Sequence, residues 1–188
     1  MSKRSERIDQ IIDETLNVLK THGDYGVTMR KIASRCGITL SSLQYYYKTK
    51  DDLLKAVTDR YFQQIIAMIH ELPEITTEEE LGELLHSFLL YAFDESDMSR
   101  LFREFWAISS RNEVINKYLA GYYVSFSEIM TEKLRPISDN DEALAQAVSL
   151  LIPYIEGYPI VALSIPKGLN STSELLKVVI WKCLKQNL

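Results

Sequence analysis

The sequence predicts an all-α protein of about nine helices. Apolar residues recur every three or four positions along most of the 188 residues, which is the spacing of one helix face. Turn-forming residues are sparse, with only seven Gly and five Pro in the chain. No stretch alternates polar and apolar residues as a half-buried strand does, and no internal repeat is present.

The first helix is predicted from the apolar residues between Ile8 and Leu19, which recur at intervals of three and four. Their polar neighbours would form the opposite, solvent-facing side of this amphipathic helix. We expect the helix to stop near His22, Gly23 and Asp24.

The next two helices are short and read as a helix-turn-helix over residues 29–48. Thr28 and Thr39 each precede a periodic run, where a side-chain oxygen can accept a hydrogen bond from the first helical turn. Gly37 supplies the left-handed backbone that the exit from the first of these helices needs. A second helix held in this way presents its outer face to a DNA major groove. The motif therefore predicts a DNA-binding protein.

A fourth helix is predicted to follow Thr49, which has two aspartates in the next turn. Acidic side chains suit the positive end of a helix dipole. This helix should end before Pro73. A second capping box, Thr76-Thr77-Glu78-Glu79-Glu80, predicts a helix that runs to about Phe93.

The rest of the chain is expected to break at residues 94–97 and then to form four more helices. Their predicted ranges are 97–110, 112–134, 140–164 and 172–187. The third of these contains Pro153, Gly157 and Pro159, so we expect it to be kinked or broken.

The formal net charge of −5 is unevenly distributed along the chain. Residues 1–60 carry eleven Lys/Arg against eight Asp/Glu, whereas residues 61–188 carry ten against eighteen. Residues 25–50 contain no acidic residue and five basic ones: Arg30, Lys31, Arg35, Lys48 and Lys50. A solvated charged face would give such a pattern, but so would a patch that attracts phosphates. Because the patch coincides with the helix-turn-helix, we favour DNA binding.

The composition, 46% hydrophobic and 25% charged, is ordinary for a globular protein. No run approaches the ~18 consecutive apolar residues of a membrane span. The start, MSKRSERIDQ, has no apolar segment behind its charges, so no signal peptide is expected. Cys36 occupies a core position of the motif and lies far from Cys183 in the sequence, so we expect no disulfide framework. The expected location is a reducing cytoplasm.

One segment resembles the TetR family of transcriptional regulators. It runs from Val27 to Leu54 and reads VTMRKIASRCGITLSSLQYYYKTKDDLL. The family hallmark is a helix-turn-helix followed closely by an aromatic pair, a lysine and an acidic cap, here Tyr46-Tyr47 and Lys50-Asp51-Asp52-Leu53. Two positions depart from the family pattern: Ser41, where glycine is frequent, and Gln44, where tyrosine is usual.

The resemblance implies a regulator, expected to be a repressor, that binds a palindromic operator in double-stranded DNA as a homodimer. A small-molecule effector would release it from the operator. The implied domains are a helix-turn-helix DNA-binding domain over 1–50 and a helical ligand-binding and dimerisation domain over 51–188. The last two helices would form a four-helix bundle with a partner subunit. The last helix has apolar residues on more than one side, including Leu175 and Val178, which also fits burial within one subunit.

Two groups of residues are expected to contact DNA. Phosphate contacts are predicted for Thr28, Tyr45, Lys48 and Lys50. Base-edge contacts are predicted for Thr39, Leu40, Ser41, Ser42 and Gln44. The second group has no arginine for bidentate recognition of guanine, so the shape and flexibility of the operator should also matter. Lys3, Arg4 and Arg7 form either an arm that reaches the adjacent DNA or a solvated terminus.

Ten of the nineteen aromatic residues fall between Phe88 and Phe126, at helical spacing. Most of them must belong to the core. Cavities between bundled helices are mainly apolar with a few polar groups, so we expect a subset to line an effector pocket. The expected effector contacts are Phe105, Trp106 and Tyr122, with Glu104 or Glu156 as a polar anchor. Core packing is the competing interpretation for each of them.

Two other classes of function are weighed against this one. The chain could be a helical protein-interaction module with a structural helix-turn-helix, or an enzyme for a small apolar substrate, which needs a convergent acid/base pair. The three histidines lack the spacing of a metal site. Neither a glycine-rich phosphate loop nor a nucleophile paired with a base is present. We therefore expect no metal, no cofactor and no catalytic residue.

Overall fold

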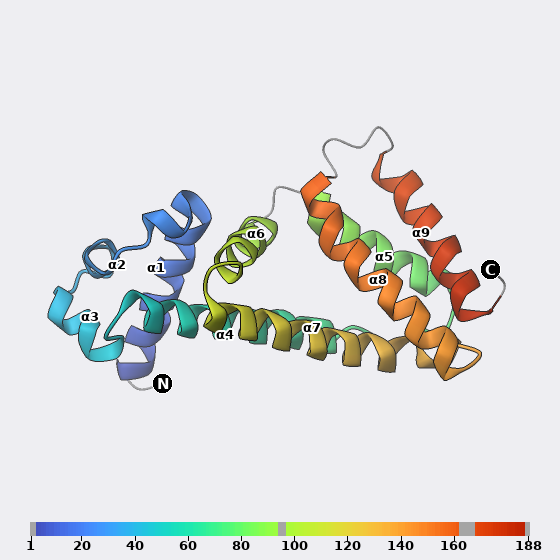
Figure 1. Cartoon of the computed structure of the whole chain (residues 1–188), viewed down its shortest axis with the longest axis horizontal. Helices are drawn as coiled ribbons and strands as arrows, with labels where there is room; N and C mark the ends of the chain where they lie inside the picture. The colour runs from blue at the N-terminus through green and yellow to red at the C-terminus, as the bar shows by residue number, and fades with distance from the viewer. Residues whose placement is uncertain (1–2, 94–96, 162–167, 187–188) are drawn as a thin grey trace. The chain divides into compact units, whose positions relative to one another are not determined.

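The computed structural model describes residues 3–93, 97–161 and 168–186, and this part of the chain contains nine α-helices and no strand (Figure 1). The prediction of an all-α fold is confirmed. The helices are α1 (Lys3–Gly26), α2 (Met29–Arg35), α3 (Leu40–Tyr46), α4 (Lys50–His70), α5 (Glu78–Phe93), α6 (Asp97–Ser109), α7 (Glu113–Leu134), α8 (Asp141–Val161) and α9 (Leu169–Leu184). A short 3-10 turn, η1 (Arg135–Ile137), follows α7.

The chain divides into two compact units. Unit 1 contains Met1–Ile65 and Arg100–Tyr122, and unit 2 contains Ile66–Ser99 and Tyr123–Leu188. Packing therefore does not divide the chain at residue 50, because the first part of α4 and residues from α6 and α7 belong to the same unit as the helix-turn-helix. The functional division at residue 50 stays a prediction.

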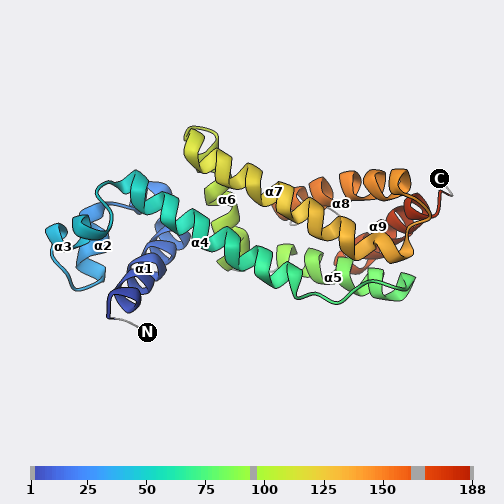
Figure 2. The same cartoon turned by 90° about the horizontal axis from the view of Figure 1, so that it is seen from below.

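Unit 1 is built around an apolar core shared by its first four helices. Ile11 and Leu19 of α1 are fully buried, as are Ile32 of α2 and Leu43 of α3. In both views α2 and α3 lie beside α1 (Figures 1 and 2). Helix α1 is longer than predicted, but Gly23 interrupts its helical geometry with φ +63° and ψ −174°. The predicted stop near this glycine is thus a change of backbone direction within α1.

Unit 2 contains α5, α8 and α9, which pack against one another (Figures 1 and 2). Leu85 of α5, Leu151 of α8 and Ile180 of α9 are fully buried. The predicted capping box at the start of α5 is confirmed, because Glu80 N donates to Thr77 Oγ1 at 3.1 Å and Glu80 Oε2 accepts from Thr77 N at 3.1 Å. No helix within the described ranges is long and apolar enough to cross a membrane.

The sequence predicts that the eighth helix is kinked or broken. The break is wrong, because α8 runs without interruption through Pro153 and Gly157 to Val161, and the kink stays a prediction. A proline in a helix leaves the carbonyl four residues earlier without its N–H partner. Here that residue is Ser149, and both Ser149 and Pro153 are exposed, so water can hydrate the carbonyl. The predicted break at residues 94–97 falls mostly on 94–96, and the predicted helix ends at 164 and 187 also lie outside the described residues.

Candidate nucleic-acid and effector sites

The turn between α2 and α3 follows the geometry that its glycine predicts. Gly37 has φ +64°, which confirms the left-handed conformation at this position. Its N–H donates to Ser34 O at 3.1 Å, and the next N–H, of Ile38, donates to Ala33 O at 3.0 Å. This pair of bonds is the Schellman end of a helix, and it satisfies carbonyls that the last turn of α2 would leave free.

The two predicted threonine caps are confirmed. Thr28 Oγ1 accepts a hydrogen bond from Lys31 N at 3.2 Å, and Thr39 Oγ1 accepts one from Ser42 N at 3.1 Å. Such caps stabilise a helix by about 1 kcal/mol each. Two short helices of seven residues each thereby acquire defined first turns.

Helix α3 buries one side and exposes the other. Leu43 is fully buried, whereas Ser41, Gln44 and Tyr45 are exposed, Tyr45 by 75%. Gln44 has no hydrogen-bond partner among the residues that the structure describes, so both ends of its amide are available to an external partner. Leu40 at the start of the helix is half-buried.

The hydroxyl groups at the start of α3 bond to one another. Thr39 Oγ1 lies 3.0 Å from Ser41 Oγ and 2.8 Å from Ser42 Oγ. A hydroxyl has one donor and two acceptor positions. Thr39 Oγ1 uses all three, because it also accepts the Ser42 N–H, whereas the Ser41 and Ser42 hydroxyls each keep capacity for an outside partner.

The five basic residues of the helix-turn-helix segment differ in whether a carboxylate of the described chain pairs with them. Arg35 Nε lies 2.6 Å from Glu14 Oε2, and Lys50 Nζ lies 2.8 Å from Asp24 Oδ1. Arg30, Lys31 and Lys48 form no ion pair with any described residue. The uncompensated positive charge of this segment is therefore carried by those three side chains.

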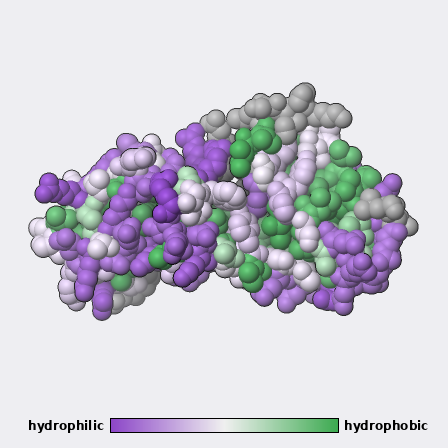
Figure 3. Space-filling model, in the orientation of Figure 1, coloured by the Kyte–Doolittle hydropathy of each residue, from purple (hydrophilic) through white to green (hydrophobic). Residues whose placement is uncertain are grey.

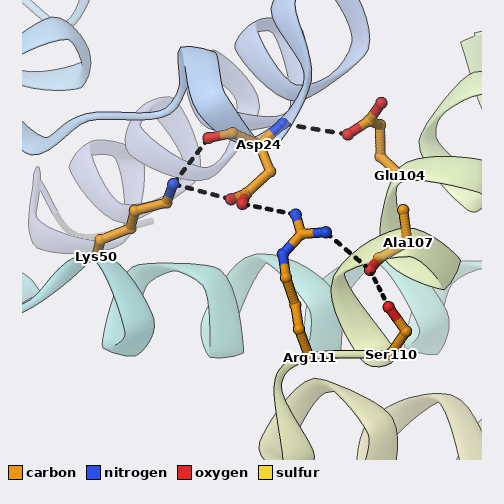
Figure 4. Close-up of polar contacts among 6 residues, drawn as sticks. All are labelled: Asp24, Lys50, Glu104, Ala107, Ser110 and Arg111. Carbon is orange, nitrogen blue, oxygen red and sulfur yellow. Dashed lines mark hydrogen bonds and ion pairs between the residues drawn. The ribbon is translucent and has the colours of Figure 1, made fainter.

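Asp24 lies at the centre of a polar cluster that the sequence did not indicate (Figure 4). Its carboxylate pairs with Lys50 at the start of α4 and with Arg111 Nη2 at 2.9 Å, between α6 and α7. Its backbone O accepts from Lys50 Nζ at 2.7 Å, and its backbone N–H donates to Glu104 Oε2 of α6 at 3.1 Å. The Asp24 side chain is only 17% exposed, against 50% for that of Arg111.

Burial raises the pKa of the Asp24 carboxyl, but the hydrogen bonds and charges of Lys50 and Arg111 outweigh this and hold the pKa below its ordinary value of 3.8. Asp24 is therefore charged at neutral pH. No signal in the sequence pairs residues 24 and 111, because they are separated by the whole helix-turn-helix and by three further helices, α4, α5 and α6.

Five aromatic side chains of unit 1 form a contiguous cluster. They come from α4, α6 and α7: Tyr61, Phe62, Phe102, Phe105 and Tyr122. Phe62 stacks on Tyr122 with ring centroids 4.9 Å apart, and Tyr61 lies 5.0 Å from Phe105. Phe102 bridges Phe62 and Tyr122 at 5.9 Å and 5.5 Å.

The expected effector contacts occupy different environments. Phe105 and Tyr122 are buried in the aromatic cluster, whereas Trp106 is 51% exposed on α6. Glu104 accepts the Asp24 backbone N–H, and Glu156 is half-buried on α8 in unit 2. Their role as effector contacts stays a prediction. No group of three potential metal ligands occurs among the described residues.

The N-terminal basic residues are also not alike. Arg7 Nη1 donates to Gln10 Oε1 at 2.6 Å and to Cys36 O at 3.3 Å, which ties Arg7 to the end of α2. Lys3 and Arg4 are exposed. Both lie in the first turn of α1, and whether they act as an arm or as a solvated terminus stays a prediction.

Helices α8 and α9 expose large apolar side chains. Figure 3 shows hydrophobic atoms gathered over these two helices of unit 2. Leu175 is 60% and Val178 41% exposed on α9, and α8 exposes Leu150 and Tyr154. Leu176, one residue from Leu175, is buried, so α9 carries apolar residues on two sides, as predicted.

Comparison with known proteins places the site in a family. Residues 11–57 match the model of the bacterial regulatory proteins, tetR family. The chain is 40% identical over 187 residues to an HTH-type transcriptional regulator in the dhlA 5′ region of Xanthobacter autotrophicus, covering 97% of this chain and 93% of that protein.

The solved structures that share the fold include the following two. One is a TetR transcription regulator from Haloarcula marismortui, with TM-score 0.75 and 22% identity, covering 97% of this chain and 98% of the other. The second is the multidrug binding protein EbrR complexed with ethidium, with TM-score 0.74 and 18% identity, covering 95% and 98%.

Proposed function

Because this chain belongs to the TetR family of transcriptional regulators, with a DNA-binding helix-turn-helix, we propose that it is a ligand-responsive repressor. It binds a palindromic operator as a homodimer, and a small-molecule effector releases it. The observation that carries the proposal is the exposed outer face of α3, which lies in a segment whose unpaired charges are all positive.

In this proposal Thr39, Leu40, Ser41, Ser42 and Gln44 face the base edges. Among these residues Gln44 is the best candidate for direct recognition of a base, because its amide has no partner in the described chain and can both donate to and accept from one adenine. The mutually bonded hydroxyls can address several base edges and so contribute less discrimination.

Phosphate contacts are assigned to Thr28, Tyr45 and Lys48, and these contacts position the protein without reading sequence. Arg30 and Lys31 join them, because neither is compensated by a carboxylate in the described chain. Lys50 has its ammonium group bound to Asp24, so we assign it to holding the start of α4 in place.

The homodimer is proposed to form through α8 and α9. Their exposed apolar side chains would be removed from water in a four-helix bundle with the same helices of a partner. A dimer would also set two recognition helices about 34 Å apart, or a multiple of this, which a palindromic operator requires.

The effector is proposed to contact Phe105, Trp106 and Tyr122, with Glu104 or Glu156 as polar anchor. A related fold holds ethidium in EbrR, so the architecture can accommodate a planar aromatic compound. Phe105 and Tyr122 are buried, so an effector that touches them must separate the rings of the aromatic cluster. Release from DNA then requires that the effector bind the two arrangements unequally.

The test is to footprint the purified chain on DNA upstream of its own gene while small molecules are screened for release. The expected result is a protected palindrome whose protection disappears with one compound class and weakens steeply with salt. Binding that is absent or insensitive to salt would refute the proposal and favour a protein-interaction module. Turnover of the releasing compound would instead indicate an enzyme.

A further inference from the structure

Asp24 joins three parts of unit 1 that are far apart in the sequence. It follows the kink in α1 and leads into α2, since Asp24 O also accepts the N–H of Val27 at 3.1 Å. Its carboxylate holds Lys50 and Arg111, and its N–H bonds to Glu104. One residue thus contacts the helix-turn-helix segment, the start of α4 and the α6–α7 turn.

The kink at Gly23 makes this arrangement possible. With φ +63°, Gly23 adopts a backbone conformation that L side chains rarely adopt. A Cβ atom at Gly23 would lie 3.1 Å from Glu104 Oε2, which is closer than ordinary contact. The glycine therefore allows both the turn in the backbone and the approach of the Glu104 carboxylate to the Asp24 N–H.

Arg111, which pairs with the Asp24 carboxylate, is itself held in place by its own hydrogen bonds and by those of a neighbouring residue. Arg111 Nη1 donates to Ala107 O at 3.1 Å, and Ser110 Oγ donates to the same carbonyl at 2.8 Å (Figure 4). These bonds tie Arg111 to the last turn of α6. A displacement of α6 therefore moves the guanidinium that binds Asp24.

The same helix also carries part of the aromatic cluster. Phe105 follows Glu104 directly and lies one turn before the end of α6. Its ring is 5.0 Å from Tyr61 and 5.6 Å from Phe62 of α4. Separating these rings displaces α6 relative to α4, and the Asp24 contacts span those two helices.

We propose that Asp24 is a positioning residue for DNA binding, and that its pair with Arg111 is the contact through which α6 controls the helix-turn-helix. While the pair is intact, α2 and the start of α4 are held in the arrangement that binds the operator. Movement of α6 breaks the pair and releases both. This inference rests on the proposed function, and it names the contact through which regulation acts.

Asp24→Asn and Arg111→Met test the two halves of the contact. Asn retains the shape of Asp24 but loses the charge. Arg111→Met removes the pair between Asp24 and the α6–α7 turn, together with the bond from Arg111 to Ala107 O, and leaves the pair with Lys50 in place. The matched control is Asp9→Asn, because Asp9 also lies on α1 and its Oδ1 pairs with Arg60 of α4 at 2.7 Å, without involving α6 or α7.

The assay is operator affinity, measured on a duplex that the wild-type protein selects from a random-sequence pool. We expect Asp24→Asn and Arg111→Met each to weaken binding about tenfold, which corresponds to about 1.4 kcal/mol. The double variant should be no weaker than Asp24→Asn within about twofold, because the pair is already broken. The control should change affinity by less than about twofold at an unchanged melting temperature.

Two further readouts separate positioning from direct contact or general stability. The slope of log K against log salt should stay at the wild-type value, whereas loss of a phosphate contact would lower its magnitude by about 0.9 per site. Operator DNA should slow hydrogen exchange at residues 104–112 in the wild type and in Asp9→Asn, but not in Arg111→Met, because coupling between sites is reciprocal.

The outcomes distinguish the two proposals. If the wild type selects no DNA, the proposed function fails. If the wild type binds DNA and the Asp24 and Arg111 variants behave like the Asp9 control, only the Asp24 inference fails. A reduced salt slope in Arg111→Met would also overturn it, because Arg111 would then touch DNA itself.

Discussion

Lys48→Ala and Lys50→Ala should affect operator binding in different ways, although the two lysines stand only two positions apart. Lys48 is exposed and forms no ion pair with the described part of the chain. Lys50 Nζ is bound to Asp24 through both the carboxylate and the backbone oxygen. Only Lys48 has a charge free to displace the counterions of a phosphate.

The difference can be expressed as a salt dependence. Each phosphate that a protein neutralises contributes about −0.9 to the slope of log K against log salt. A dimer would lose two such contacts in Lys48→Ala, so the slope should become shallower by about 1.8. Between 50 and 200 mM salt, wild-type affinity should then fall about twelvefold more than that of Lys48→Ala. Lys50→Ala should lower affinity at every salt concentration and leave the slope at the wild-type value.

A fluorescence-anisotropy titration of one operator duplex at four salt concentrations measures both slopes. Lys55→Ala is a suitable control, because it removes a lysine of α4 that lies 3.8 Å from Asp52. If Lys50→Ala makes the slope shallower and Lys48→Ala does not, Lys50 contacts a DNA phosphate in spite of its ion pair with Asp24. The assignment of free and compensated cations would then be refuted.

Four further predictions follow from the same residues. Gln44→Ala should relax sequence preference at one operator position by about 1–3 kcal/mol, measured by affinities for single-base variants of the operator. Gly37→Ala should lower the free energy of unfolding by about 1–2 kcal/mol, because φ is +64° there and an L side chain is strained in this conformation. An added Cβ meets no neighbouring atom, so the backbone strain is the sole cause of the loss. The stabilisation that charged Asp24 provides should be present in full above its ordinary pKa of 3.8 and be lost as the pH falls through its lower folded pKa; urea unfolding of wild type and Asp24→Asn at pH 7 and at a series of pH values below 3.8 measures this. Leu175→Glu with Val178→Glu should weaken dimerisation at least about tenfold in sedimentation equilibrium, because charges would be buried at the interface, while circular dichroism of the subunit stays unchanged.

Features set by neighbouring residues could be predicted from the sequence. The caps at Thr28 and Thr39 and the left-handed Gly37 depend on bonds that span three to five residues, so short patterns contain the necessary information. The charge segregation and the all-α class are likewise local or compositional. The kink at Gly23 was expected only as a helix end, because residues 24–26 return to helical geometry beyond it.

Features set by the tertiary arrangement could not be predicted in this way. The pair between Asp24 and Arg111 joins residues 87 positions apart, and neither lies in a recognisable motif. The uninterrupted helix through Pro153 depends on the exposure of Ser149, which becomes known only when the packing of α8 is known. The individual effector contacts depend on which aromatic rings separate, and the spacing of aromatic residues does not specify that.

The basic segment shows why a charge count alone does not identify a DNA-binding surface. Glu14 and Asp24 lie outside residues 25–50, yet they compensate two of its five cations. The two compensated side chains, Arg35 and Lys50, bind the segment to α1. Their charges therefore stabilise the fold and are not available to attract DNA. The cations that remain free flank the outer face of α3 in the sequence. Different residues of one basic cluster thus provide DNA affinity and hold the helix-turn-helix in place. A substitution at Arg35 or Lys50 should therefore weaken DNA binding mainly because it misplaces the helix-turn-helix, and less because it removes a positive charge.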